Sequence, residues 1–568
     1  MDFNPLLGHL VYMTLTLILV AATVVTWLAE RSVEHLKLAI AALCFIAAVL
    51  LFVVTDFERA ILLSSILAAA IFGASSVKYN HSGLKLIVTD LPLAFAGTVP
   101  FFIVQYPLAV IAVLAGGIAL ILAAVAALYV PGPPVSLELQ VLFFSIAFIG
   151  LAAAYRASGG PVPFQRIAAQ RRCFFSTFIA SLLDPLSWRQ FGGLALSDIA
   201  KDPLPLMAAL PARTLDYPDI IVIQHESIFD PRVFGLPVEP IVEAFLSPKN
   251  SLYGSLNVDI FGGGSWQSEF SLLTGLSSAS FGSNAYFLFK RGVGRFHNSL
   301  PKTLTALGYR TMLTSSCRRS FLNYDEFYRS IGISERIFTD DFHPPFDISR
   351  FETTNSDALF LQAALGAHMK MITDDAAPRF LYALTNFNHG PHNRRLVAPG
   401  HFESERAFAA ASLPDACYAE YYARLVETAV TWNRIKSELS TRFPKRPMLI
   451  VHYGDHQPVM ARRIEAKFKL PIDARRQFRT FYARETLHDC SDRLISGRGP
   501  DLDIAFLGTV ALQQAGLPLD EIFATRASLL EHCGEAYFAS SSERKRRFHR
   551  TLVDLGMIDV APTLRYQH

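Results

Sequence analysis

Long apolar runs, separated by short charged connectors, fill the first part of the chain. Hydrocarbon offers no partner for an open backbone, so a segment that crosses it must be a helix of about 20 apolar residues. Five stretches reach or nearly reach that length: His9 to Leu28, Leu38 to Thr55, Ile61 to Val77, Pro107 to Val130 and Leu139 to Tyr155. The pattern therefore predicts a multi-pass α-helical membrane domain of about five spans.

A sixth span is the alternative, because the uncharged stretch 91–130 is about twice the length that one span requires. Pro92, Pro100 and Pro107 interrupt helical hydrogen bonding in its first half, which favours an interfacial or re-entrant segment there. No basic residue precedes the first apolar run, so we expect that run to stay attached rather than act as a cleaved signal. Five spans place the two chain ends on opposite faces, and we expect a cytoplasmic N-terminus and an external C-terminal domain.

A turn-rich connector follows at Arg156 to Pro163, and Arg166, Arg171 and Arg172 then precede the apolar stretch 173–183. Arginines beside aliphatic and aromatic side chains are typical of a helix at the lipid interface. A helix that packs on the soluble domain is the alternative. The predicted domains are a membrane domain, a juxtamembrane linker with an interfacial helix, and a catalytic domain, at residues 1–157, 158–205 and 206–568.

Beyond the connector, short β-branched runs alternate with longer amphipathic stretches. This alternation predicts a doubly wound α/β domain, with a parallel sheet covered by helices on both faces. Residues 418–432 have the apolar spacing of a core helix. The predicted strands are Asp219 to Gln224, Tyr309 to Ser316, Arg379 to Thr385 and Pro447 to Tyr453.

Composition agrees with a membrane block joined to a globular block. Hydrophobic residues make up 51% of the chain and charged residues 18%, which is too apolar for an ordinary soluble protein. The net charge of +3 is not gathered in a basic stripe, so nucleic acid is not an expected partner. Six cysteines without a CxxC pair argue against a disulfide scaffold or a zinc knuckle.

Polar side chains follow three of the four predicted strands. Glu226 follows the first, His389 and His392 the third, and Asp455 and His456 the fourth. Ligands bind at the carboxyl ends of the strands in such sheets, and carboxylates with imidazole suit a divalent cation. We expect a divalent cation, with Mn²⁺ as the first choice and Zn²⁺ or Mg²⁺ as alternatives.

Ser265 ends a run of three glycines in the stretch 257–276. The pattern predicts a short strand, a tight turn and a helix that starts at this serine. Unpaired N–H groups and the helix dipole favour an anionic adduct at such a position. A cation would also help a hydroxyl to act as nucleophile. Ser265 is therefore the predicted nucleophile, with phosphorus as its target.

The series HESIFD, GGGSWQSEF with LLTGL, NHGPH and GDH resembles the membrane-anchored lipoteichoic acid synthase and phosphoglycerol transferase branch of the alkaline phosphatase and sulfatase superfamily. The resemblance implies a sulfatase-like extracytoplasmic domain, one divalent metal and a covalent intermediate on a hydroxyl, usually a threonine. It also implies that His389 lies near the substrate phosphate. The metal ligands that it implies are Glu226, Ser265, Asp455 and His456.

One segment departs from the family pattern. Members that take glycerol phosphate from phosphatidylglycerol carry a histidine, then Trp or Tyr, and an Arg, where this chain has Ser315, Leu322 and Tyr324. Arg318 and Arg319 are predicted to replace those contacts, because guanidinium groups suit phosphate oxygens. His392 is a further predicted substrate contact.

The expected function is a transferase that moves phosphoglycerol from a membrane phospholipid, through Ser265, to a periplasmic glucan or similar glycan. Phosphatidylglycerol is the expected donor, and the inner membrane of a Gram-negative cell the expected location. The alternatives are a phosphoethanolamine transferase, a phosphodiesterase or sulfatase-like hydrolase, and a non-catalytic membrane scaffold.

Overall fold

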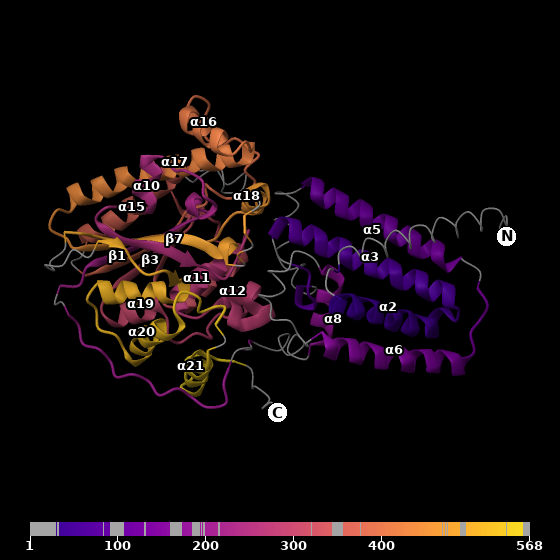
Figure 1. Ribbon diagram of the computed structural model, residues 1–568. Coiled ribbons are helices and arrows are strands. Elements are labelled where there is room, and N and C mark those ends of the chain that lie inside the picture. Colours follow the sequence, from indigo (N-terminus) through magenta and orange to yellow (C-terminus); the bar gives the residue numbers. More distant parts are fainter. Residues whose placement is uncertain are drawn as a thin grey trace. The chain divides into compact units, whose positions relative to one another are not determined.

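A computed structural model of the chain divides into two compact units, residues 1–192 and residues 193–568. It describes residues 30, 33–82, 85–90, 107–129, 132–158, 173–184, 194, 196, 199–213, 216–319, 321–342, 356–374, 377–468, 470–471, 473, 475–488, 496–540 and 542–560. Figure 1 shows a helical unit and a unit built around a sheet.

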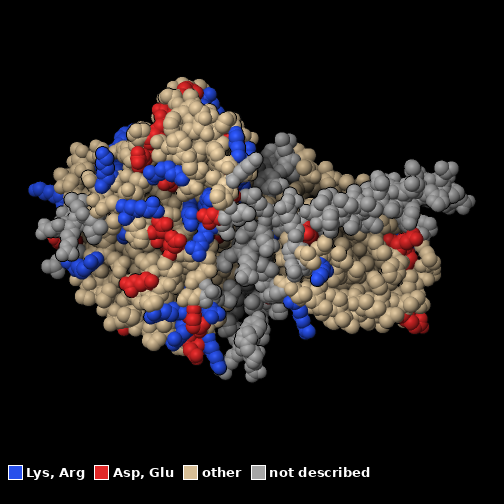
Figure 2. Space-filling model, in the orientation of Figure 1, with Lys and Arg blue, Asp and Glu red and all other residues tan. Residues whose placement is uncertain are grey.

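Four helices of the first unit are long and apolar enough to cross a membrane. They are α2 (Val33–Val54), α3 (Phe57–Ser82), α5 (Pro107–Leu128) and α6 (Leu137–Ala157). They confirm the last four predicted spans, whereas the run at 9–28 and the proline-rich part of 91–106 lie outside the described residues. Figure 2 shows few charged side chains on the described surface of this unit, as a lipid-facing surface requires.

The apolar stretch 173–183 forms α8 (Phe174–Leu183), which belongs to the membrane unit. Phe175, Phe178 and Ile179 are buried in one apolar cluster with residues of α2 and α3, such as Leu38 and Ala68. The helix α8 therefore packs against the spans α2 and α3, and its position at the lipid interface remains a prediction. A short 3-10 turn, η1 (Val88–Asp90), also contacts α8.

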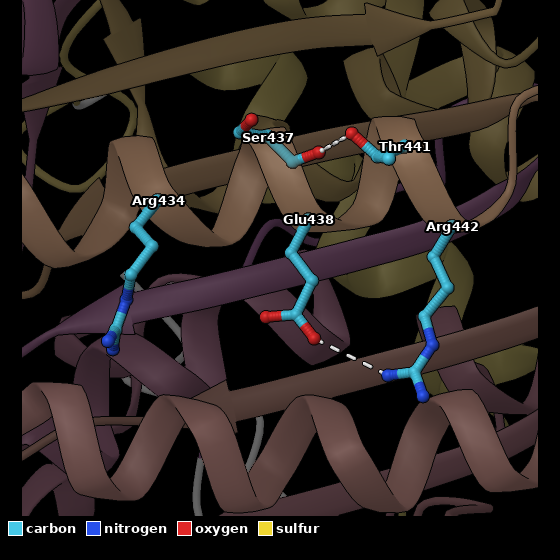
Figure 3. A pocket seen from close by; sticks show the side chains of 5 residues that line it. All are labelled: Arg434, Ser437, Glu438, Thr441 and Arg442. Atoms are coloured by element: carbon cyan, nitrogen blue, oxygen red, sulfur yellow. Dashed lines mark hydrogen bonds and ion pairs between the residues drawn. The ribbon is translucent and has the colours of Figure 1, made fainter.

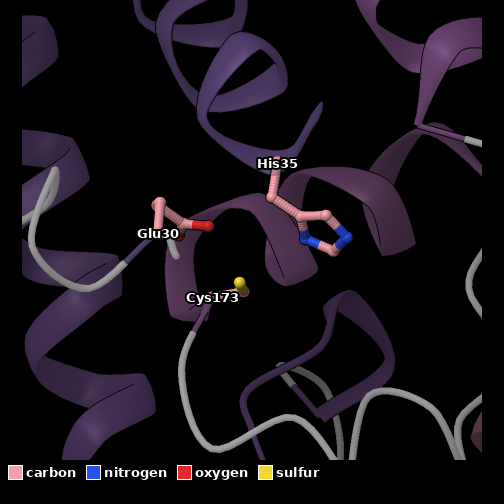
Figure 4. Close-up of side chains that lie close together, drawn as sticks. All are labelled: Glu30, His35 and Cys173. Carbon is pink, nitrogen blue, oxygen red and sulfur yellow. The ribbon is translucent and has the colours of Figure 1, made fainter. Parts of the chain in front are cut away.

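Three potential metal ligands, Glu30, His35 and Cys173, gather at the start of α8 (Figure 4). Both carboxylate oxygens of Glu30 are already engaged there. One accepts the backbone N–H groups of Phe175 and Ser176 at 3.1 Å each, and the other accepts the Ser176 hydroxyl at 2.5 Å. The cluster therefore serves to cap a helix N-terminus that would otherwise be left without partners.

The second unit is built on a mixed sheet in the order β4-β3-β5-β1-β6-β7-β2-β8, with β9 paired to β2. The first five strands in that order run parallel, and β7 runs antiparallel to both of its neighbours. The strands are β1 (Asp219–His225), β2 (Ser251–Asn257), β3 (Arg310–Ser315), β4 (Glu335–Ile337), β5 (Arg379–Leu384), β6 (Met448–Gly454), β7 (Arg479–Leu487), β8 (Gly497–Arg498) and β9 (Leu502–Asp503).

All four predicted strands are present, as β1, β3, β5 and β6, and they are adjacent and parallel. The prediction of a short strand just before the glycine run was wrong. The strand β2 ends at Asn257, and residues 258–264 form a loop. The antiparallel strands β2 and β7 were not predicted, and they make the sheet mixed rather than parallel.

Helices cover both faces of the sheet (Figure 1). One apolar core joins the sheet to α11 (Ser265–Thr274), α12 (Leu288–Arg291), α13 (Leu300–Ala306), α14 (Tyr324–Ser330), α19 (Ile504–Gln514), α20 (Glu521–Cys533) and α21 (Glu543–Asp554). The other joins it to α10 (Pro240–Leu246), α15 (Asp357–Asp374), α16 (Glu403–Ser412), α17 (Ala416–Arg442) and α18 (Ala461–Phe468). Short 3-10 turns are η3 (Pro231–Phe234), η4 (Ser278–Phe287), η5 (Phe321–Asn323), η6 (Thr339–Asp341) and η8 (Arg476–Phe478).

Candidate active site

The glycine run places Ser265 at the first residue of α11. Gly262, Gly263 and Gly264 have φ values of 81°, 148° and 93°, a region that side chains with a Cβ rarely adopt. A Cβ on Gly264 would also lie 2.8 Å from Nε2 of Gln267. The run is therefore required by the turn, and it confirms that the helix starts at the serine.

The Ser265 hydroxyl lies against residues from two other parts of the chain. It donates to Oε2 of Glu226 at 2.9 Å, and its oxygen is 3.4 Å from Nε2 of His456. Glu226 follows β1 and His456 follows β6. The structure thus brings together side chains separated by 39 and 191 residues. They meet at the carboxyl ends of the strands, where a ligand site was predicted.

Glu226, Asp455 and His456 form the group with metal-ligand spacing. Their ligand atoms all lie within 4.8 Å of one another, and all three residues are buried. Nε2 of His456 is 3.4 Å from Oε1 of Glu226 and 3.6 Å from Oδ2 of Asp455. This is the set of ligands that the sequence predicted, with Ser265 beside it.

Hydrogen bonds hold these ligands so that one atom of each faces a common point. Oδ1 of Asp455 accepts the backbone N–H groups of Ser227 and His456 at 2.7 Å each, whereas Oδ2 is buried without a hydrogen-bond partner. Nδ1 of His456 donates to the carbonyl of Gln457 at 3.1 Å, which leaves Nε2 as the ligand atom. A buried oxygen without a donor and an oriented imidazole fit a bound cation.

The first position of the GDH motif must be a glycine for a steric reason. A Cβ on Gly454 would lie 1.8 Å from the carbonyl oxygen of Ile228, closer than any contact that a backbone tolerates. The segment after β1 therefore crosses directly over the end of β6. This close crossing brings Glu226 and Asp455 to the same point.

Two carboxylates, Glu226 and Asp455, surround the single imidazole of His456, and the three groups shift one another's pKa values. Burial opposes the charge of His456, but Asp455 and Glu226 raise its pKa to about 9. Burial and the charge of Glu226 raise the pKa of Asp455 well above its usual range. Burial also opposes the charge of Glu226, yet His456, and then His389 and Ser227, bring its pKa below its usual value. A divalent cation would stabilise both carboxylates in their charged forms.

His225 and His452 lie on the other face of the sheet. Both are fully buried, and their rings pack with Phe245, Trp432 and Phe481. Burial lowers the pKa of His225 to about 3 and that of His452 well below its usual value. Neutral imidazoles in an aromatic core indicate a structural role for both residues.

Both histidines of the NHGPH segment interact electrostatically with Glu226. His389 is half-buried, and its charge lowers the pKa of Glu226. His392 is 5% exposed, its Nε2 donates to the carbonyl of Asn388 at 2.8 Å, and burial lowers its pKa to about 3. These contacts favour a supporting role for His392 over the predicted contact with substrate.

Arg319, another predicted substrate residue, has partners within its own part of the chain. Its guanidinium donates to Oδ1 of Asp325 at 2.7 Å and to Oδ2 of Asp341 at 2.5 Å, and it stacks over Phe338. Two carboxylates already satisfy this cation, so it braces its own loop. Arg318 is half-buried beside it, and its contact with substrate remains a prediction.

Tyr324, at a position where the family pattern indicates headgroup contact, turns inward. It is 2% exposed, and its hydroxyl is 3.4 Å from Oε1 of Glu269, which also binds the hydroxyl of Tyr328 through its other oxygen. Glu269 lies on α11, four residues after Ser265, and is 1% exposed. This carboxylate was not predicted from the sequence, although its being the one charged residue of α11 was a usable signal.

Glu269 is the centre of a hydrogen-bond network beneath the metal-ligand group. Gln224 donates to its Oε1 at 3.1 Å, and Oε1 of Gln224 accepts the hydroxyls of Tyr453 and Tyr382 at 2.6 and 3.2 Å. Gln224 lies near the end of β1, two residues before Glu226, and Tyr453 lies near the end of β6, two residues before Asp455. The network ties α11 and α14 to the strands that carry the ligands.

Replacing Glu269 with glutamine is expected to make stability less dependent on pH. Burial, followed by the charge of Glu226, raises the pKa of Glu269 from 4.5 to about 7. The folded chain therefore keeps a proton that the unfolded chain releases, so this contribution is complete below pH 4.5 and is lost as the pH rises through 7. The difference amounts to about 3 kcal/mol.

The thermal midpoint of the protein in detergent, measured at pH 5 and pH 8, tests this expectation. Relative to Glu269→Gln, the wild type should lose stability between the two values. Glu438→Gln, on an exposed face of α17, is the control and should follow the wild type. Equal pH dependence in wild type and Glu269→Gln would contradict the assignment.

A shallow recess on the surface of α17 is separate from these residues (Figure 3). All of its lining residues belong to that one helix, and Arg442 is 3.4 Å from Glu438 within it. The helix covers the face of the sheet opposite to α11. The recess therefore takes no part in the candidate site. Its lining residues are Arg434, Ser437, Glu438, Thr441 and Arg442.

A serine at a helix N-terminus beside two carboxylates and an imidazole, on a covered α/β sheet, is the arrangement expected for the alkaline phosphatase and sulfatase superfamily. Residues 218–480 match the model of the Sulfatase family. The match spans β1 to the start of β7 and includes all the candidate ligands. It confirms the superfamily that the sequence motifs indicated.

Individual proteins are similar over larger or smaller shares of the chain. An uncharacterized protein of Haemophilus influenzae is 26% identical over 312 residues, which is 54% of this chain and 55% of that protein. The chain thus spans about half the length of this curated relative.

Two solved structures are similar in fold. The Streptococcus pyogenes phosphoglycerol transferase GacH, in complex with sn-glycerol-1-phosphate, is 16% identical, covers 61% of this chain and 86% of its own, and has a TM-score of 0.44. The lipooligosaccharide phosphoethanolamine transferase EptA from Neisseria meningitidis is 10% identical, covers 93% and 96%, and has a TM-score of 0.46.

Proposed function

We propose that this protein is a membrane phosphotransferase that moves a phosphoglycerol headgroup from a phospholipid, phosphatidylglycerol in the first place, to a periplasmic glucan or similar glycan. The observation that carries the proposal is the Ser265 hydroxyl at the start of α11, 2.9 Å from Glu226 and 3.4 Å from His456. Four apolar helices of spanning length supply the reason for a lipid donor.

In the first half-reaction, Oγ of Ser265 forms a bond to the headgroup phosphorus. The bond between phosphorus and the diacylglycerol oxygen breaks, and that oxygen takes up a proton as diacylglycerol leaves. The proton of the serine has an acceptor at Oε2 of Glu226. Backbone N–H groups at the start of α11 face the charge that develops on the phosphoryl oxygens.

Glu226, Asp455 and His456, with Ser265, are the residues that would hold the divalent cation, and Mn²⁺ is our first choice. When bound, such an ion lowers the pKa of a hydroxyl and neutralises phosphoryl charge. The chain's own contribution is to keep the ligands in place. Asp455 is held by two backbone N–H groups and His456 by the carbonyl of Gln457.

In the second half-reaction, a sugar hydroxyl attacks the phosphoserine, the bond between Oγ and phosphorus breaks, and Ser265 regains its proton. We assign His389 to contact with the phosphoryl oxygens in both steps, as the family resemblance of the NHGPH motif implies, and its charge acts on Glu226. The catalytic domain would face the periplasm from the inner membrane.

The test incubates the purified full-length protein with phosphatidylglycerol or phosphatidylethanolamine, each labelled in the headgroup, with Mn²⁺ or with a chelator. We expect phosphatidylglycerol with Mn²⁺ to add glycerol phosphate to the peptide that contains Ser265, as measured by mass spectrometry. The chelator should prevent this labelling.

The other outcomes separate the alternatives. Phosphoethanolamine on Ser265 would indicate a phosphoethanolamine transferase. Release of glycerol phosphate to water, without any acceptor, would indicate a hydrolase. Absence of an adduct with either lipid would contradict the phosphotransferase and favour a scaffold.

A further inference from the structure

The segment 386–397 carries His389 and leaves the sheet beside the metal-ligand group. It begins just after β5, whose Leu384 pairs with Gln224, two residues before Glu226. The segment has no helix or strand of its own, so its backbone carbonyls need donors from elsewhere. What holds it decides where His389 stands.

Arg424 of α17 supplies donors to this segment from a fully buried position. Its Nη1 donates to the carbonyls of Phe387 and His389 at 3.3 and 3.0 Å. Its Nη2 donates to those of Pro391 and Arg394 at 3.5 and 2.7 Å. The fifth N–H group, on Nε, binds Glu420 at 2.9 Å. All five donors of the guanidinium are thus used, four of them on one segment.

Glu420, one turn earlier on α17, holds the rest of the segment. Its Oε1 accepts the backbone N–H groups of Leu396 and Val397 at 2.8 and 3.4 Å, and its Oε2 accepts Arg406 at 2.5 Å. One buried ion pair therefore binds carbonyls on one side of the segment and N–H groups on the other. Such a pair is a weak source of stability, but it defines a conformation closely.

His389 itself is oriented by this arrangement. Its carbonyl is bound by Arg424, and its Nδ1 donates to the carbonyl of Gly390 at 2.6 Å. Nε2 is then the ring nitrogen left for a ligand. The backbone of Glu226 is tied to the start of the same segment through the hydroxyl of Thr385 at 3.3 Å.

We propose that Arg424, with Glu420, is a positioning residue that fixes the segment 387–397 so that His389 faces the phosphoryl group carried on Ser265. The proposal rests on the proposed function for the reaction in which His389 takes part. A lysine cannot replace Arg424, because one ammonium with three donors cannot reach four carbonyls and a carboxylate at once.

The first measurement is hydrogen exchange of the full-length protein in detergent. Arg424→Lys should increase exchange in the peptide 386–397 by at least about tenfold, as local opening becomes easier. Arg484→Lys is the matched control, because this buried arginine of β7 donates to the carbonyl of Val510 at 3.0 Å. It should leave that peptide unchanged. Unchanged exchange in Arg424→Lys would overturn the proposal whatever reaction the protein catalyses.

The second measurement is a double-mutant cycle on the rate at which Ser265 is labelled. Arg424→Lys is expected to lower this rate by about 10- to 100-fold, since small displacements of a positioned group have such effects. In a His389→Ala background the same change should have no further effect. For the control Arg484→Lys, the fold-loss in labelling rate should be the same in the wild-type and the His389→Ala backgrounds. If Arg424→Lys lowered the labelling rate by the same factor with and without His389→Ala, Arg424 would not act through His389, and the positioning role would be overturned.

Glu420→Gln serves as the second variant if Arg424→Lys does not fold. It keeps the shape of the side chain, weakens the bond to Arg424 and should show the same two effects on a smaller scale. If the wild type were not labelled, the proposed function would be contradicted. The hydrogen-exchange measurement would still test whether Arg424 holds the segment, because it does not require the reaction.

Discussion

Replacing Ser265 with alanine is expected to abolish the covalent intermediate and to lower transfer by about 10⁴-fold or more, the scale on which enzymes lose activity with their nucleophile. The hydroxyl is the group that meets both Glu226 and His456, at 2.9 and 3.4 Å. Alanine keeps the helix N-terminus and the ligand cluster. Labelling of the purified variant with headgroup-labelled lipid measures the loss.

Ser271→Ala is the matched control for this experiment. Ser271 lies on the same helix, is fully buried, and donates to Oδ2 of Asp259 at 3.2 Å, outside the ligand cluster. Its loss should cost about 1 kcal/mol of stability and leave labelling intact. A Ser265→Ala protein that still transfers the headgroup at the wild-type rate would contradict the assignment of the nucleophile.

Replacing Asp455 with asparagine is expected to weaken divalent metal binding by at least about 100-fold and to remove activity in proportion. Asparagine can still accept the two backbone N–H groups that bind Oδ1 of Asp455. It puts a neutral group where the buried, unpartnered Oδ2 stands, and so removes one of the two negative charges that favour the cation.

The thermal midpoint with and without Mn²⁺ measures this change. At 100 times the dissociation constant, a ligand of the folded state stabilises by about 2.7 kcal/mol, and the variant should lose that gain. Asp503→Asn is the control, because this buried carboxylate also accepts two backbone N–H groups, from Ala505 and Phe538. Equal stabilisation of Asp455→Asn and wild type by the metal would rule out Asp455 as a ligand.

The central strands were predictable because they are short runs rich in apolar residues, and β1 and β6 are buried over their whole length. The strands β2 and β7 were missed for the opposite reason. Their sequences, SLYGSLN and RTFYARETL, mix glycine and charged residues with apolar ones. Their pairing with each other and with β6 makes them strands, and no local pattern records that pairing.

The candidate site was predictable in its ligands but less so in its surroundings. Parallel strands bring their carboxyl ends to one edge, so residues such as Glu226 and Asp455 could be placed together from sequence alone. Arg319 could not be placed in this way. Its partners Asp325 and Asp341 lie 6 and 22 residues away, and only the folded loop shows that they already bind it.

Ser265, on its glycine turn, was the strongest single prediction from the sequence, because the backbone requirement and the helix start are local properties. Arg424 and Glu420 are the opposite case, two charged residues inside a stretch whose apolar spacing predicted a core helix. The sequence determined the membrane helices, the central strands and the ligands, since these depend on local periodicity and on one rule of sheet geometry. The tertiary structure decided which charges are paired and which residues hold His389, because such contacts join segments whose separation no pattern encodes.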